Sequence, residues 1–131
     1  RDIVISETNP DLIAERAGYA LSALPEEVAK VAEYELAKRG VNVFSHSPAY
    51  RWEKNVPLLI PHANSELIHM VEKQETEGKI VCNPNCTTPA YVPIIKALDD
   101  AGYKIKRINI VTNRLCQGKV MQLLIQNMLI L

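Results

Sequence analysis

Short apolar runs alternate with charged, helix-like segments along this chain. Residues 1–6 alternate apolar and polar positions, which predicts a short strand, and residues 11–16 predict a brief helical connection. Residues 18–24 form an apolar run that is typical of a buried strand and stops at Pro25. The chain therefore opens with two predicted strands that are separated by a short helix.

A longer helix is predicted after the second strand. Pro25 suits the first turn of a helix, and Glu26 and Glu27 complement the positive end of the helix dipole. Gly40 follows two basic residues and ends the segment. Apolar positions recur within it at mixed spacings of three and four: Val28, Val31, Ala32, Tyr34 (or Glu35) and Leu36. Because another strand is predicted at 41–45, we expect a right-handed βαβ unit with parallel strands.

The rest of the chain continues this alternation. The predicted elements are a helix capped by Asn64 or Ser65 that runs to about Glu77, a strand at 79–82, a helix at 87–101 and a strand at 104–112. This order favours an α/β fold, with a partial Rossmann-like, mostly parallel sheet and flanking helices. The length of 131 residues suits one small domain.

Composition excludes several classes of protein. Lys and Arg balance Asp and Glu at 15 each, and this zero net charge argues against a nucleic-acid binder or a polybasic membrane anchor. Aromatic residues make up only 5% of the chain, too few for a platform on which bases stack. No apolar run reaches the roughly 18 residues that a membrane span needs. We therefore expect neither nucleic acid nor a membrane as a partner.

The cysteines indicate a reducing, cytoplasmic setting. Cys82, Cys86 and Cys116 form no even disulfide framework, and no secretory signal opens the chain. No metal-ligand spacing joins them to the histidines, so no metal site is predicted. A lone thiol in this setting is available for chemistry.

The segment 83–88, Asn-Pro-Asn-Cys-Thr-Thr, carries the strongest chemical signal. Pro84 makes a strand-to-helix turn and Cys86 falls at the start of the helix that follows, where the unpaired amides and the helix dipole favour a thiolate, the nucleophilic form of the side chain. Those amides, with the side chain of Asn85 or Asn83, could support an oxyanion formed when the sulfur attacks a carbonyl. The alternative is a small buried cysteine that only fills the core.

Four stretches together resemble the aspartate-semialdehyde dehydrogenases of the branch found in archaea and fungi. They occur in the family's order and spacing, and the resemblance covers roughly residues 1–114. The stretches are Asn-Pro-Asn-Cys-Thr-Thr at 83–88, Leu-Ser-Ala-Leu-Pro at 21–25, Val-Phe-Ser-His-Ser-Pro-Ala-Tyr-Arg-Trp at 43–52 and Val-Pro-Leu-Leu-Ile-Pro at 56–61.

The resemblance implies a reaction and its site. The family reduces aspartyl phosphate to the semialdehyde with NADPH through a cysteine thioester, and full-length members are homo-oligomers. Cys86 would be the nucleophile with Asn85 beside it, and Arg51 would bind phosphate. The cofactor would be lined by Ser22, Ala23, Leu24 and Pro25. The alternatives are a surface arginine at Arg51 and a plain helix N-terminus at residues 22–25.

The chain also departs from the family pattern. No two of its five glycines are close enough to form a dinucleotide-binding loop, so the first βαβ unit is expected upstream of residue 1. The family's catalytic histidine and substrate arginine are expected downstream. None of the histidines matches that catalytic histidine, and we interpret all three as solvent-facing or loop residues: His46, His62 and His69. We assign residues 1–85 to the C-terminal part of an NADP-binding domain and 86–113 to the start of a catalytic domain.

Residues 114–131 form an apolar tail for which we hypothesise out-of-frame translation. Loss of one base between the codons AAC and CAG accounts for Asn113 onward as written. Restoring that base can give Asn-Gln-Ala-Val-Ser-Gly-Gln-Gly-Tyr, the pattern of the family. The alternative is a genuine apolar helix at 117–131 for packing or dimerisation.

Two further functions compete with this interpretation. Malonyl-CoA reductase shares the fold and the cysteine, but its nucleophile segment resembles Thr-Pro-Leu-Cys-Thr. A non-catalytic α/β interaction module, docking a partner through its apolar tail, belongs to a different class. Under the favoured interpretation the chain is incomplete and inactive by itself.

Overall fold

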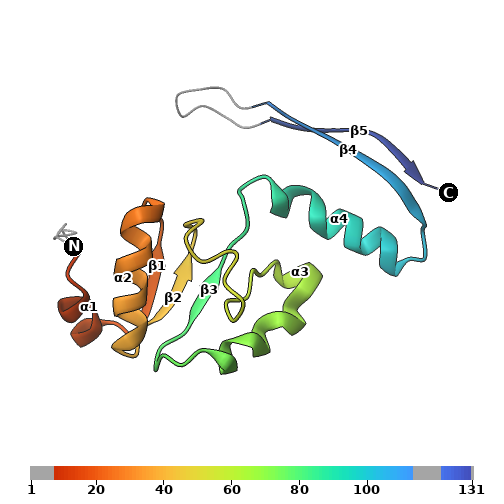
Figure 1. Cartoon of the computed structure of the whole chain (residues 1–131). Helices are drawn as coiled ribbons and strands as arrows, with labels where there is room; N and C mark the ends of the chain where they lie inside the picture. The colour runs from red at the N-terminus through yellow and green to blue at the C-terminus, as the bar shows by residue number, and fades with distance from the viewer. Residues whose placement is uncertain (1–7, 114–121, 131) are drawn as a thin grey trace, which may run out of the picture. The chain divides into compact units, whose positions relative to one another are not determined.

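A computed structural model describes residues 8–113 and 122–130 of the chain, shown in Figure 1. The chain divides into two compact units. Unit 1 comprises Arg1–Leu59 and Glu66–Pro84, and unit 2 comprises Ile60–Ser65 and Asn85–Leu131. The strand predicted at residues 1–6 lies outside the described residues.

A three-stranded parallel sheet forms the centre of unit 1. Its strands are β1 (Tyr19–Ser22), β2 (Asn42–Ser45) and β3 (Ile80–Cys82), in the order β1-β2-β3. The register pairs Ser22 with Ser45 and Ser45 with Cys82, so the strands end side by side. This confirms the predicted α/β class with a parallel sheet.

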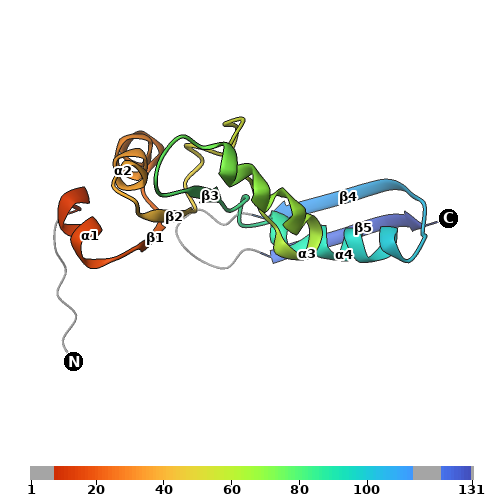
Figure 2. The same ribbon diagram turned by 90° about the horizontal axis from the view of Figure 1, so that it is seen from below.

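The helix α2 (Glu26–Lys38) connects β1 to β2, as predicted, and lies on one face of the sheet (Figure 2). Gly40 adopts a φ of 82° where the chain turns back into β2, a conformation that favours glycine. The side chains buried from α2 are Ala29, Glu33, Leu36 and Ala37. Two positions of the expected apolar series, Val28 and Val31, are instead 50% and 67% exposed.

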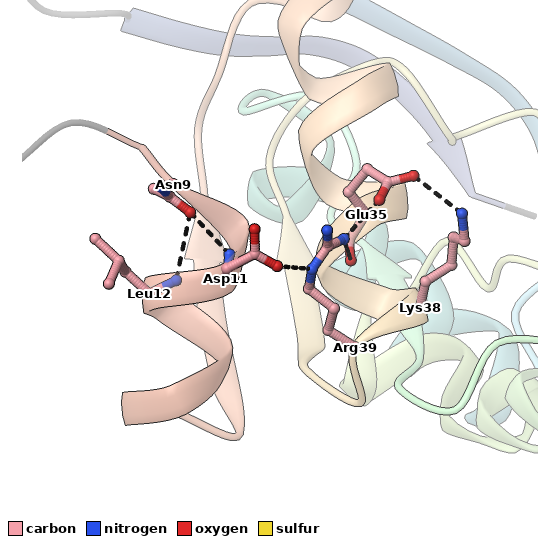
Figure 3. Close-up of polar contacts among 6 residues, drawn as sticks. All are labelled: Asn9, Asp11, Leu12, Glu35, Lys38 and Arg39. Carbon is pink, nitrogen blue, oxygen red and sulfur yellow. Dashed lines mark hydrogen bonds and ion pairs between the residues drawn. The ribbon is translucent and has the colours of Figure 1, made fainter.

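The first helix, α1 (Pro10–Arg16), is tied to α2 by charged side chains (Figure 3). Oδ1 of Asn9 accepts from the amides of Asp11 and Leu12, which caps the helix start. Nε of Arg39 donates to Asp11 at 2.6 Å, and its Nη1 donates to Glu35 at 2.5 Å. The ion pair between Arg39 and Asp11 therefore joins the end of α2 to the start of α1.

The outer edge of β3 is occupied by other parts of unit 1. The side chain of Gln74 donates to the carbonyl of Ile80 and accepts from its amide, both at 2.8 Å. The amide of Cys82 donates to Pro57, and its carbonyl accepts from Leu59, both at 2.9 Å. At the opposite edge of the sheet, β1 is the terminal strand among the described residues. Its Tyr19 and Leu21 are 71% and 84% exposed, so it is not the buried strand that we expected.

The helix predicted from Asn64 or Ser65 to about Glu77 differs in type and extent. The structure has α3 (Pro61–Asn64) followed by the 3₁₀ helix η1 (Ser65–Lys73). Neither Asn64 nor Ser65 is the N-cap, because the helix already begins at Pro61 after Ile60. The 3₁₀ helix ends at Lys73, and the next residue, Gln74, hydrogen-bonds to β3 through its side chain.

In unit 2, the helix α4 (Thr88–Asp100) matches the predicted helix, and Gly102 follows it with a φ of 85°. The predicted fourth strand, β4 (Ile105–Asn113), is not in the parallel sheet. It pairs antiparallel with β5 (Gln122–Ile130), because the tail supplies an extended partner for it. The alternative of a helical tail is therefore wrong for residues 122–130. Within the described residues, no helix is both long and apolar enough to cross a membrane.

Candidate functional site

The carboxyl ends of the three parallel strands form the candidate site of unit 1. Ligands of α/β proteins bind beyond this edge of the sheet, where loops leave the strands. Here the strands end at Ser22, Ser45 and Cys82. The segments that follow them contain the residues for which the resemblance implies roles in binding and catalysis.

The segment 22–25 leaves the end of β1. Ser22 is buried, and its hydroxyl donates inward to Oε1 of Glu33 at 2.5 Å. Its carbonyl accepts from the amide of His46 at 2.7 Å. Ala23 and Pro25 are exposed and Leu24 is half-buried, so these three residues and not the hydroxyl of Ser22 present a surface to a ligand.

Glu33 is a buried residue at this edge that the sequence analysis missed. Its side chain is 0% exposed, and its Oε1 also accepts from the hydroxyl of Ser45 at 2.8 Å. The signal was present in the helical spacing, since Glu33 lies four residues from Ala29 and from Ala37, both buried. A charged residue on the buried face of a helix is a candidate for a specific polar role.

The guanidinium of Arg51 joins the loops that follow β2 and β3. Its Nε donates to the carbonyl of Asn83 at 3.0 Å, and its Nη2 donates to the carbonyl of His46 at 2.8 Å. Arg51 is half-buried, and two of its five N–H groups are used in these bonds. These two bonds therefore orient the side chain of Arg51 and leave other N–H groups of its guanidinium able to bind an anion.

His46 and Asn83 lie beside Arg51 at the strand ends. Nδ2 of Asn83 approaches Nε2 of His46 to 3.2 Å. All three predicted solvent-facing histidines are exposed: His46, His62 and His69. His62 belongs to α3 and His69 to η1, so these two are helical and not loop residues.

Cys86 was expected at the start of the helix after β3, but it lies in the turn between β3 and α4 and is exposed. Its Sγ donates to Oδ1 of Asn85 at 3.5 Å. The helix proper begins at Thr88, two residues after the cysteine. We expected the amides at the helix start to face the sulfur, but those of Thr87 and Thr88 donate to Asn85 at 3.1 and 2.9 Å.

The orientation of Asn85 bears on its expected role. Its Oδ1 accepts from Sγ of Cys86 and from the hydroxyl and amide of Thr87. An oxyanion needs a donor, so the Nδ2 group of Asn85 and not Oδ1 would have to provide the support. A rotation of the amide group would bring that donor to the sulfur side.

The two described cysteines differ in environment. Burial raises the pKa of the Cys82 thiol to about 11, and the negative charge of Glu33 adds to the rise. Burial likewise raises the pKa of Tyr50 to about 12, and Glu33 again contributes. Cys82 therefore stays protonated at neutral pH, whereas Cys86 lies at the surface. Among the residues that the structure describes, no group of three His, Cys, Asp or Glu side chains could hold a metal ion.

Comparison with known families gives a match over the first half of the chain. Residues 1–71 match the family described as "Semialdehyde dehydrogenase, NAD binding domain". An aspartate-semialdehyde dehydrogenase from Methanothermobacter thermautotrophicus is 37% identical over 122 residues, which cover 90% of this chain and 34% of that protein. A malonyl CoA reductase (NADP) from Metallosphaera sedula is 31% identical, with 87% of this chain and 38% of that protein covered.

Comparison with solved structures also finds aspartate semialdehyde dehydrogenases. The chain matches an aspartate semialdehyde dehydrogenase with NADP from Candida albicans at 32% identity and a TM-score of 0.68, covering 82% of this chain and 32% of that one. It also matches an aspartate semialdehyde dehydrogenase II complexed with ASA from Vibrio cholerae at 28% identity and a TM-score of 0.64, covering 73% and 27%. The chain thus spans about a third of the length of the curated relatives it matches.

Proposed function

Because the chain belongs to the semialdehyde dehydrogenase family through its NAD-binding domain, we propose that it carries part of the active site of an NADP-dependent aspartate-semialdehyde dehydrogenase. The observation that supports this most strongly is the segment 83–88, which follows the last parallel strand and holds Cys86 exposed in a turn before a helix. In α/β proteins, the segments that follow parallel strands at their carboxyl ends contribute to the binding of cofactor and substrate.

The proposed reaction uses Cys86 as the nucleophile. The thiolate attacks the aldehyde carbon, and Asn85 supports the negative charge that forms on the carbonyl oxygen. Hydride leaves that carbon and a thioester remains, and attack by inorganic phosphate releases aspartyl phosphate and returns the thiolate. Arg51, oriented by two backbone carbonyls, would bind the phosphate. NADP supplies the acceptor of the hydride when it is bound.

The chain contains residues for part of the binding site of such a cofactor. Ala23, Leu24 and Pro25 form a partly exposed border at the end of β1, against which a nucleotide can pack. The sequence contains no glycine-rich loop for a pyrophosphate. The choice of NADP over NAD is supported by the Candida albicans structure, which is described as containing NADP.

The organisation of the chain remains part of the proposal. We assign residues 1–85 to the cofactor-binding domain, 86–113 to the start of a catalytic domain and 114–131 to out-of-frame translation. The division of the structure close to residue 84 supports the first boundary. Sequencing the gene tests the third assignment, since a coding sequence without a recoverable Gln-Ala-Val-Ser frame after Asn113 would disprove it. A cytoplasmic setting and a homo-oligomeric full-length enzyme complete the proposal.

Malonyl-CoA reductase is the second candidate, because one such enzyme is 31% identical to this chain. The segment Asn83–Cys86 favours the semialdehyde enzyme, since it departs from the Thr-Pro-Leu-Cys-Thr pattern. A non-catalytic interaction module is the third candidate and predicts an ordinary thiol at position 86.

Alkylation of the thiols distinguishes an activated cysteine from an ordinary one. We expect iodoacetamide at pH 7 to modify Cys86 about tenfold faster than N-acetylcysteine. Cys82 should stay unmodified, because its pKa is raised to about 11 and its thiolate is scarce. Peptide mass spectrometry measures both rates in one sample, with Cys86→Ala as the control. A Cys86 rate no higher than that of N-acetylcysteine would favour the interaction module.

The chain by itself is expected to have no dehydrogenase activity. The family's catalytic histidine and substrate arginine have no counterparts here, and a glycine-rich loop is lacking. An assay with NADP, phosphate and aspartate semialdehyde should give the same rate for this chain and for its Cys86→Ala variant. Turnover above that of the variant would show that the residues present suffice.

A further inference from the structure

Glu33 is a buried acid for which the proposed reaction has no use. It lies in the interior of α2 with 0% exposure, and its Oε2 has no hydrogen-bond partner among the described residues. Burying a carboxyl group is unfavourable unless it is hydrogen-bonded, and an apolar side chain of similar size could fill the same space. Packing alone therefore gives no reason for an acid at this position.

The contacts of Glu33 join the ends of two strands. Its Oε1 accepts from the hydroxyl of Ser22, the last residue of β1, at 2.5 Å. The same oxygen accepts from the hydroxyl of Ser45, the last residue of β2, at 2.8 Å. Since Ser22 and Ser45 are register partners, one oxygen atom ties both strand ends to α2.

A chain of hydrogen bonds continues from Ser45 toward Arg51. Oγ of Ser45 accepts from the amide of Ser47 at 3.1 Å, and Oγ of Ser47 accepts from the amide of Ala49 at 3.3 Å. The amide of Arg51 then donates to the carbonyl of Pro48 at 3.2 Å. A hydroxyl that donates its proton to Glu33 keeps its lone pairs available to the Ser47 amide, so the two bonds of Ser45 are compatible with each other.

We propose that Glu33 is a positioning residue for the candidate site. It holds the hydroxyls of Ser22 and Ser45 and thereby orients the segment 22–25 and the turn that carries Arg51. This assignment rests on the proposed function at one point, because it is the proposed function that makes those segments the borders of the cofactor and phosphate sites. Glu33 itself touches neither ligand.

Hydrogen exchange of the full chain tests the assignment. Glu33→Gln keeps an oxygen that accepts both hydroxyls, whereas Glu33→Met keeps the volume and removes the acceptor. We expect Glu33→Met to speed exchange of the Ser47 and Ala49 amides about tenfold, and Glu33→Gln to leave it near the original rate. Glu27→Met is the matched control, because Glu27 is exposed on the same helix. The amides of α4 serve as an internal reference.

The pattern of exchange separates positioning from general stability. If Glu33→Met speeds exchange equally across β2, α2 and the turn, the residue only stabilises the fold and the assignment is wrong. The assignment is also wrong if the turn is unaffected. Should Glu33→Met fail to fold, Ser22→Ala removes one of the two hydroxyls that Glu33 holds and leaves the bond between Ser45 and the Ser47 amide intact. This variant must speed exchange of the amides of residues 23–24 while sparing α2, and unchanged exchange there would contradict the assignment.

Measuring the binding of inorganic phosphate allows this inference and the proposed function to be tested separately. Calorimetric titration of the unmodified chain tests whether the Arg51 region binds the anion. Absence of binding would count against the proposed role of Arg51, while the exchange data would still decide the role of Glu33. If phosphate binds, Glu33→Met should weaken the affinity about tenfold and Glu33→Gln should restore it.

Discussion

In a chimeric enzyme that contains this chain, replacing Cys86 by alanine should lower kcat at least about a thousandfold, because no other group would form the thioester. Such an enzyme can be made by exchanging the matching third of the Methanothermobacter thermautotrophicus protein for the residues of this chain. Reduction of NADP in the presence of phosphate and aspartate semialdehyde measures the rate.

The control for this experiment is Cys82→Ala in the same chimera. Cys82 is buried in the core of unit 1 and should tolerate alanine with little change in kcat. A folded chimera that turns over equally well with and without Cys86 would remove the cysteine from the mechanism. Activity with malonyl-CoA in place of aspartyl phosphate would transfer the proposal to the second candidate.

Replacing Gly78 by alanine should destabilise the chain by about 3 kcal/mol or more. An added Cβ would lie 2.6 Å from the carbonyl carbon of Val41 and 2.7 Å from that of Gly40, and even closer to the Val41 oxygen. These are backbone atoms at the start of β2, so relief requires the strand itself to move. A loss of this size is a large share of the roughly 5–15 kcal/mol that stabilises a typical domain.

Urea unfolding followed by circular dichroism measures this effect. Gly18→Ala is the matched control, because a Cβ at Gly18 would have no atom within 4 Å. That substitution should be neutral or stabilise the chain by up to about 1 kcal/mol, since alanine restricts the unfolded state more than glycine. Equal unfolding midpoints for the Gly78→Ala variant and the unmodified chain would contradict the close approach.

Local sequence signals predicted α2 well. Pro25, the two acids after it and Gly40 mark the ends of the helix independently of what packs against it. The buried face was predicted less well, because Val28 and Val31 belong to the apolar series and are exposed, whereas Glu33 lies outside that series and is buried. The burial of Glu33 depends on hydroxyls that are supplied by two other elements, which no local pattern contains.

The candidate site shows the same division between local and tertiary information. The place of Cys86 between a strand and a helix followed from Pro84 and the flanking patterns, whereas its exposure and its distance from the helix start did not. The bond of Arg51 to Asn83 could not be predicted, because it joins segments that meet only in the folded sheet. The pairing of β4 with β5 was likewise missed, since a pairing partner is a property of the tertiary structure.

The side chain of Gln74 has a consequence for how this sheet can grow. Its amide group hydrogen-bonds to the N–H and C=O of Ile80 as a neighbouring strand would. Pro57 and Leu59 do the same for Cys82, so the outward N–H and C=O groups of β3 are already bonded. A strand with these groups occupied offers no template for another chain. Addition of a further strand, whether in assembly of a larger domain or in aggregation, is thereby directed to the opposite border at β1.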